Sequence, residues 1–177
     1  IINQKAKDVV VICCVHGDEI FGLKVFRYFL KNKIAFPNIK VILANEKAIK
    51  LKKRYVDEDL NRIFNLKKRS TSYESKIAIK ILKETKDAKY VIDIHTTTSD
   101  IDFVPIITKT NNSIFRLLKL CQSKNVAYMV PPIGTNSLIN QVDCGISLEF
   151  NKNYARSKNG FTKVIDIIKK LTLKKFI

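Results

Sequence analysis

Apolar β-branched runs alternate along the chain with segments in which apolar residues recur every three or four positions. The first pattern predicts strands, over residues 8–15, 39–44, 89–94, 103–108, 126–130 and 144–150. The second predicts amphipathic helices, over residues 19–32, 71–86, 111–124 and 158–171. Strands that alternate with helices are typical of a mainly parallel sheet covered on both faces. The pattern therefore predicts an α/β fold, and no repeat or linker marks a domain boundary.

The longest stretch without an apolar period is 53–72, which is rich in polar and charged residues. We expect this segment to be a loop that contributes to a site, because functional residues concentrate on loops. In open α/β sheets, ligands bind beyond the carboxyl ends of the strands. Both histidines of the chain and Glu149 follow or end a predicted strand. The pattern thus predicts that a functional site lies at the carboxyl ends of the strands.

Composition changes this picture little. With 46% hydrophobic and 28% charged residues, the 177-residue chain is typical of a folded globular protein. No apolar run approaches the roughly 20 residues of a membrane span, and the first residues lack the pattern of a signal peptide. We therefore expect a cytoplasmic protein without membrane contact. The four cysteines have no zinc-binding spacing and are expected to be reduced, small apolar fillers.

The net charge of +17 raises the question of nucleic-acid binding. Lysine supplies most of it, since 27 lysines accompany only six arginines, and they are spread along the chain. The sequence has no arginine-rich arm, zinc finger or interleaved aromatic platform. Nucleic acid is therefore not the expected partner. A general positive field would instead favour small acidic substrates.

Candidate chemistry begins with the two histidines, each of which stands where an apolar run ends. His16 is followed by Glu19 in the motif HGDE, and His95 follows Asp93 in the motif DIH. Two imidazoles and one carboxylate are a set that holds catalytic zinc and leaves a fourth position for water. The first motif alone is weak, because a glutamate in the first turn of a helix is also favoured by the helix dipole. Together the two motifs predict a metallohydrolase.

The neighbouring residues can be interpreted in two ways. Gly17 would permit a sharp turn out of the strand, and Asp18 is expected to cap the helix that follows. Asp93 and His95 share one face of a strand, because side chains alternate. Asp93 could therefore accept a hydrogen bond from the imidazole of His95 and orient it. The alternative is that Asp93 satisfies nearby loop amides.

Two of the six arginines, Arg54 and Arg62, lie close together in the part of the polar loop that spans residues 54–64. The planar guanidinium binds carboxylates through two parallel hydrogen bonds, which lysine cannot do. One arginine could hold a substrate carboxylate while the other polarises the scissile carbonyl. The alternative is an internal ion-pair cluster with the acidic residues of 57–59.

Glu149 is the carboxylate near the end of the last apolar strand. A buried acid is costly unless it is paired or functional. A general base beside a metal-activated water would account for its position.

Four motifs, in their order along the chain, resemble those of the zinc carboxypeptidase superfamily, and within it the succinylglutamate desuccinylase/aspartoacylase family. They are HGDE at 16–19, Arg54-Tyr55 followed by DLNRIF at 59–64, DIHTT at 93–97, and Leu148-Glu149. The resemblance spans roughly residues 8–150. It implies an α/β, three-layer phosphorylase/hydrolase-like fold, with a mixed, mainly parallel central sheet flanked by helices.

The resemblance also implies a role for each matching residue. The implied ligands of one Zn²⁺ per chain are His16, Glu19 and His95. Asn61 and Arg62 match the pair that binds the substrate carboxylate, and Arg54 matches the residue that stabilises the oxyanion. Glu149 matches the glutamate that takes a proton from the zinc-bound water and returns it to the leaving amine.

The implied activity is zinc-dependent cleavage of the amide of an N-acyl amino acid with a free carboxylate. Two alternatives stay open: a metallocarboxypeptidase acting on short peptides, and a catalytically weak relative that binds metal or carboxylates. Glu149 and Arg54 argue against the second, because neither is needed to hold zinc. The segment 134–143 lacks the further substrate arginine that aspartoacylases carry there. We expect residues 1–177 to form one zinc-carboxypeptidase-like catalytic domain without the C-terminal β domain of aspartoacylases, and leave the oligomeric state open.

Overall fold

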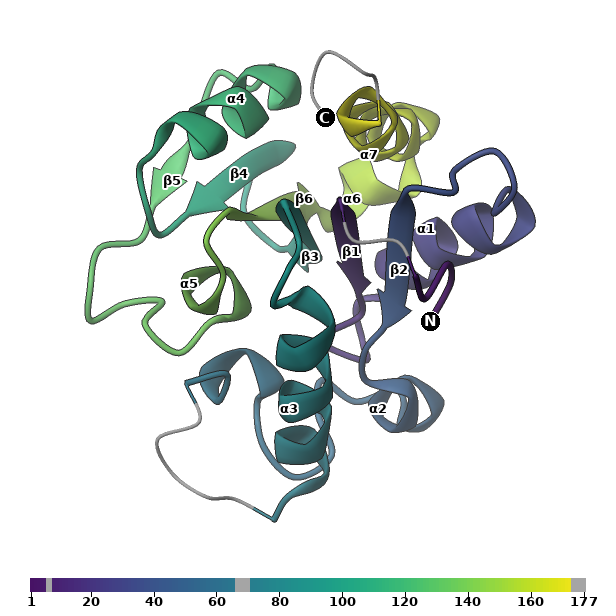
Figure 1. Cartoon of the computed structure of the whole chain (residues 1–177), viewed down its shortest axis with the longest axis vertical. Coiled ribbons are helices and arrows are strands. Elements are labelled where there is room, and N and C mark those ends of the chain that lie inside the picture. The colour runs from purple at the N-terminus through teal and green to yellow at the C-terminus, as the bar shows by residue number, and fades with distance from the viewer. Residues whose placement is uncertain (6–7, 66–70, 173–177) are drawn as a thin grey trace.

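A mixed six-stranded sheet forms the centre of the computed structural model, which describes residues 1–5, 8–65 and 71–172. The strands are β1 (Val9–Cys13), β2 (Ile39–Leu43), β3 (Tyr90–Thr97), β4 (Phe103–Ile107), β5 (Ala127–Tyr128) and β6 (Gly145–Asn151). Their order across the sheet is β2-β1-β3-β6-β4-β5 (Figure 1). β1, β2, β3 and β6 are parallel, whereas β4 pairs antiparallel with β6 and parallel with β5. The predicted α/β fold with a mixed, mainly parallel sheet is confirmed.

The helices are α1 (Ile20–Lys31), α2 (Glu46–Leu51), α3 (Tyr73–Thr85), α4 (Asn112–Cys121), α5 (Leu138–Gln141), α6 (Lys152–Arg156) and α7 (Lys158–Leu171), with a 3₁₀ helix η1 (Leu60–Arg62). The four predicted helices correspond to α1, α3, α4 and α7. The sequence did not reveal α2, α5, α6 and η1, because fewer than two turns are too short to show a helical period. Segment 53–72 is therefore not wholly irregular, and its residues 66–70 lie outside the described part of the chain.

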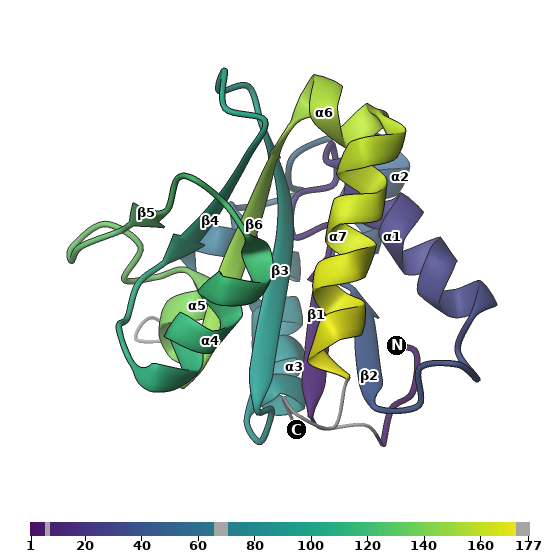
Figure 2. The same ribbon diagram turned by 90° about the horizontal axis from the view of Figure 1, so that it is seen from above.

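The sheet is covered on both faces, which explains why its strands are apolar rather than alternating. In β1 every residue is buried. Val9 and Val11 pack with α1, α4 and α7, whereas Val10 and Ile12 pack with α3 and α5. Figures 1 and 2 show these helices in two layers on either side of the sheet.

Both edges of the sheet are short or covered. Ile2 pairs with Val41 of β2, donating from its backbone nitrogen at 2.8 Å and accepting from Val41 at 3.2 Å. The amide of Asn3 donates to the backbone oxygens of Phe36 at 2.7 Å and Ile39 at 3.0 Å. At the opposite edge, β5 has only two residues.

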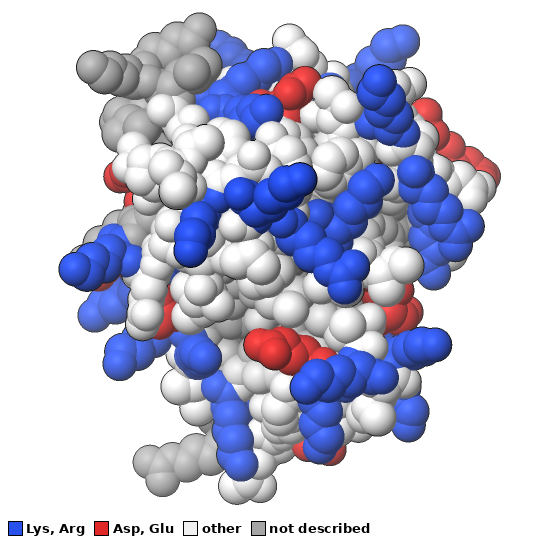
Figure 3. Space-filling view, turned by 90° about the vertical axis from the view of Figure 1, so that its right-hand side faces the viewer, with Lys and Arg blue, Asp and Glu red and all other residues white. Residues whose placement is uncertain are grey.

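Lys and Arg side chains are spread over the face shown in Figure 3, with Asp and Glu in smaller patches between them. The four cysteines are free and buried, as expected from their spacing. Among the described residues, no helix has the length and apolar character needed to cross a bilayer.

Candidate active site

The loop between β1 and α1 brings His16 and Glu19 to the carboxyl end of the sheet. Cys14 adopts a left-handed conformation with φ of 58°, which turns the chain as it leaves β1. The sequence predicted that Gly17 permits a sharp turn, but the structure shows a steric reason for glycine here. A Cβ at this position would lie 2.3 Å from the backbone carbonyl carbon of Ala48 in α2. The predicted cap at Asp18 is wrong: Asp18 is exposed and Glu19 is the N-cap residue of α1, with no side-chain cap.

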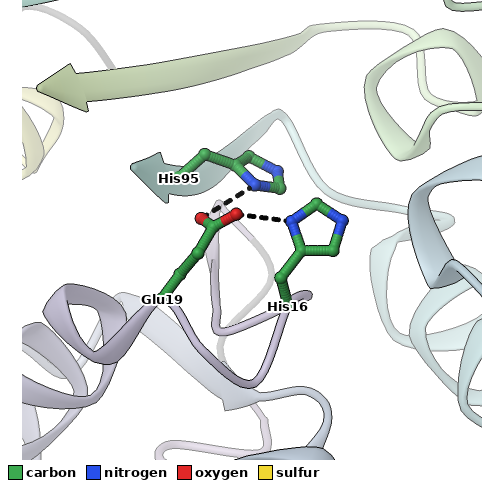
Figure 4. A group of neighbouring side chains, drawn as sticks. All are labelled: His16, Glu19 and His95. Atoms are coloured by element: carbon green, nitrogen blue, oxygen red, sulfur yellow. Dashed lines mark hydrogen bonds and ion pairs between the residues drawn. The ribbon is translucent and has the colours of Figure 1, made fainter. Parts of the chain in front are cut away.

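His16, Glu19 and His95 converge as the sequence predicted, and all three are buried (Figure 4). Glu19 bridges the imidazoles: its Oε1 lies 2.6 Å from Nδ1 of His16 and its Oε2 lies 3.2 Å from Nδ1 of His95. One ligand atom from each residue lies within 4.8 Å of the others. We call this group the metal cluster, because its donor atoms could hold a metal ion.

Each imidazole of the metal cluster also has a carboxylate at its other nitrogen. Nε2 of His95 lies 2.8 Å from Asp93, as one interpretation of the DIH motif predicted. Nε2 of His16 lies 3.1 Å from Asp59, a partner that the sequence did not reveal. Such carboxylates fix the orientation of ligating histidines. Both Nδ1 atoms are thereby directed toward Glu19.

The electrostatics of the metal cluster follow from this pairing. Burial would raise the pKa of Glu19, but hydrogen bonds from His16 and His95 outweigh it and lower the pKa to about 2. Burial would lower the pKa of His95, but the charge and hydrogen bond of Asp93 raise it well above its usual value. Negative charge on Glu19 is thus stabilised between two imidazoles whose pKa values are both raised.

Glu149 is brought to the metal cluster by strand register. β3 and β6 pair with His95 opposite Glu149, so both side chains lie on one face of the sheet. Both residues lie inside their strands rather than at the ends. Burial raises the pKa of Glu149.

The arginine loop lies against the metal cluster. Arg54 donates from Nε and Nη2 to Asp59 at 3.2 Å, and its Nη1 lies 3.6 Å from Oε1 of Glu19. The ion-pair alternative therefore holds for Arg54 and Asp59. Asn61 accepts from the backbone nitrogen of Leu138 at 3.2 Å, and Arg62 donates to the backbone oxygen of Asn61 at 3.2 Å.

The loop is held by a residue that the sequence did not reveal. Glu74, at the start of α3, is fully buried and accepts hydrogen bonds from the backbone nitrogens of Val56 at 2.7 Å and Asp57 at 3.0 Å. It also accepts hydrogen bonds from the backbone nitrogen of Glu58 at 3.3 Å and from the side-chain amide of Asn45 at 3.1 Å. No local pattern marks it, because its partners lie 16 to 29 residues away.

A cavity of about 230 Å³ brings the predicted residues together. Its lining includes seven of the eight residues singled out from the sequence, namely His16, Glu19, Arg54, Asn61, Arg62, His95 and Glu149. Asp93 lies behind His95. The remaining wall includes Ile106, Met129 and Ile139. Their roles stay predictions, but the structure places them around one space.

A larger cavity, of about 590 Å³, lies between α1 and α6. Its lining includes Lys24, Arg27, Lys152 and Arg156 but none of the predicted metal-ligating or catalytic residues. The smaller cavity is therefore the candidate active site, because chemistry depends on which groups converge rather than on volume.

Comparisons with known proteins identify the family of the chain. The family model "Succinylglutamate desuccinylase/Aspartoacylase catalytic domain" matches residues 5–173. The chain is 31% identical to an N-acyl-aromatic-L-amino acid amidohydrolase (carboxylate-forming) of Xenopus tropicalis, over 67% of this chain and 43% of that protein. It is 28% identical to an aspartoacylase of Rattus norvegicus, over 70% of this chain and 46% of that protein. The chain thus spans less than half the length of these relatives.

Solved structures show the same fold. The succinylglutamate desuccinylase of Chromobacterium violaceum superposes with a TM-score of 0.76 at 20% identity, covering 99% of this chain and 66% of that one. The fold, the order of the motifs and the match of the family model lead to one assignment. The chain belongs to the succinylglutamate desuccinylase/aspartoacylase catalytic domain family.

Proposed function

We propose that this protein is a zinc-dependent amidohydrolase that cleaves the amide of an N-acyl amino acid carrying a free carboxylate. The observation that supports this most is the single cavity that joins the metal cluster to Glu149 and Arg62. The relatives named as an N-acyl-amino acid amidohydrolase and an aspartoacylase support the same reaction class. A cavity of about 230 Å³ favours a small acyl-amino acid over a peptide.

The donor set fits zinc. Two imidazole nitrogens and a carboxylate, each buried, are the ligands of catalytic zinc sites, and carboxylates at both Nε2 atoms orient the rings. His16, Glu19 and His95 would hold the ion. Zinc bound there would supply Lewis-acid activation of water and of the substrate carbonyl.

The chain's own residues would perform the remaining steps. Asn61 and Arg62 hold the substrate carboxylate, which fixes the position of the amide in the cavity. Glu149 accepts the proton of the attacking water and delivers it to the amide nitrogen as the C–N bond breaks. Its raised pKa favours this role, because a group that titrates nearer neutral pH can both accept and return a proton. Arg54 stabilises the negative charge that develops on the carbonyl oxygen.

The metal is tested first. Wild-type protein and His95→Ala are purified side by side without chelator, and their metal content is measured by mass spectrometry. We expect about one zinc per chain in the wild type and little in the variant, because the variant lacks one of three ligands. Absence of stoichiometric metal in the wild type, even after zinc is added, would contradict the proposed site.

Glu149→Gln tests the reaction. The variant keeps the shape of the side chain, so we expect it to retain zinc while hydrolysis of acyl-amino acids falls by roughly 100-fold or more. Undiminished hydrolysis would remove Glu149 from the mechanism. A wild-type protein that holds zinc but cleaves neither acyl-amino acids nor short peptides would instead support the catalytically weak, metal-binding alternative.

A further inference from the structure

Three of the residues that line the active-site cavity are apolar, and we call them the apolar wall: Ile106 in β4, Met129 after β5 and Ile139 in α5. Ser137 and Ser147 also line the cavity. Ile106 lies opposite Ser147 of β6, on the face that also carries Glu149. The strand order β3-β6-β4 therefore places His95, the base Glu149 and Ile106 in succession across the sheet.

The residues of the apolar wall differ in burial and in side-chain flexibility. Ile139 is 2% exposed, and the backbone nitrogen of Met129 donates to the oxygen of Ile107 at 2.9 Å. Met129 is the only methionine of the chain. Its unbranched thioether can adjust to apolar groups of different shape.

Of the two arginines that line the cavity, only Arg62 is available to bind a substrate carboxylate. Arg54 is already paired with Asp59 at 3.2 Å. Arg62 forms no ion pair with a carboxylate among the residues that the structure describes. With Arg62 bound to the first carboxylate, a second one placed against the apolar wall would have no unpaired lysine or arginine among the described residues that line the cavity. Burying an unpaired charge in such surroundings is strongly unfavourable.

We propose that Ile106, Met129 and Ile139 form a subsite for an apolar amino-acid side chain, so that the substrate is an N-acyl amino acid with a single carboxylate. This inference rests on the proposed function, since that function places the other carboxylate at Asn61 and Arg62. It names the substrate class within that function.

Binding tests the subsite apart from turnover. Zinc-loaded Glu149→Gln is titrated calorimetrically with N-acetyl-L-methionine, N-acetylglycine and N-acetyl-L-aspartate, which share an acyl group and an α-carboxylate. We expect N-acetyl-L-methionine to bind about tenfold more tightly than N-acetylglycine, because its side chain leaves water, and N-acetyl-L-aspartate to bind most weakly. Equal binding of the first two, or tighter binding of the aspartate, would overturn the subsite.

Variants of the wall make the test specific. Met129 is only partly buried, so Met129→Arg should fold, and we expect it to shift the binding ratio of N-acetyl-L-methionine to N-acetyl-L-aspartate by about tenfold or more toward aspartate. Met129→Leu is the control of similar size and should keep the preference. An unchanged ratio in Met129→Arg would exclude Met129 from the subsite.

Turnover by the zinc-loaded wild type separates the two proposals. Faster cleavage of N-acetyl-L-methionine than of N-acetyl-L-aspartate supports both the function and the subsite. Preferential cleavage of the aspartate leaves the amidohydrolase intact and overturns the subsite. Cleavage of neither, with tight binding of N-acetyl-L-methionine in Glu149→Gln, contradicts the hydrolase and supports the subsite.

Discussion

Each imidazole of the metal cluster is held between two carboxylates. His16 contacts Glu19 and Asp59, and His95 contacts Glu19 and Asp93. Glu19 is shared, whereas Asp59 and Asp93 each serve one ring. The two outer carboxylates therefore fix which nitrogen of each ring is directed to the centre.

Removing the charge of Asp93 should weaken metal binding. Asp93 is 1% exposed, and Asp93→Asn retains its shape while replacing the carboxylate that orients His95. We expect zinc affinity to fall by about 10- to 100-fold, which is typical when such a partner is lost. Competition with a chromophoric chelator measures the change. Asp100→Asn, an exposed residue after the same strand, is the matched control, and equal affinities in both variants would contradict the role of Asp93.

For single residues, the sequence allowed prediction where the neighbouring residues form a recognisable pattern. A histidine after an apolar run and an acid within one are visible in a short window, so the metal cluster and Glu149 could be predicted. The contact of Asp59 with His16 spans 43 residues, and nothing near Asp59 reveals it. The apolar wall escaped notice because isoleucine and methionine are ordinary core residues.

At the scale of elements, α3 organises the active-site loop through one side chain. The buried carboxylate of Glu74 receives three successive backbone N–H groups, and the segment they belong to is followed by Asp59 and η1. A loop whose backbone is bound in this way has few alternative conformations. Arg54 and Asp59 thus depend on a helix that does not itself line the cavity.

Truncating Glu74 should therefore affect both stability and activity. In Glu74→Ala the backbone donors of Val56 and Asp57 lose their buried acceptor, at a cost of about 1–3 kcal/mol for each unsatisfied group. We expect a lower free energy of unfolding in urea and a lower rate of hydrolysis. Glu46→Ala, at an exposed position in the first turn of α2, is the control. Wild-type stability in Glu74→Ala would show that the loop is held by other contacts.

The long elements were predictable for a physical reason. Each of the four predicted helices has at least ten residues, which is enough to repeat an apolar face. The family resemblance implied a mixed sheet, but neither it nor periodicity identified β4 as the strand that runs antiparallel to β6, since an apolar run has no direction. Short elements such as η1 and α5 are set by tertiary contacts and leave little trace in the sequence.

For the molecule as a whole, the cysteines report on global unfolding. Burial raises the pKa of Cys14, Cys121 and Cys144 to about 12, and that of Cys13 well above its usual value. At pH 8, well below these pKa values, only a very small fraction of each thiol is the reactive thiolate. The native fold should therefore suppress thiol chemistry at all four positions.

This suppression predicts the outcome of labelling. With an aromatic disulfide reagent at pH 8, we expect no rapid reaction of native protein and four equivalents in denaturant. The slow labelling of native protein should accelerate as pH rises toward 12, because more thiolate forms. One rapidly reacting thiol in the native state would show that the fold opens locally around it.

The paired N-terminal segment has a consequence for behaviour in concentrated solution. An exposed edge strand offers free N–H and C=O groups to a strand of another molecule, and this is a common route to aggregation. Here the backbone of Ile2 forms hydrogen bonds with the N–H and C=O groups of Val41 on the outer side of β2. At the other edge, β5 has only two residues and is too short to pair with a long strand. The pairing of Ile2 with β2 thus protects the sheet against strand addition between molecules, and removal of residues 1–3 would expose β2 as a site for self-association.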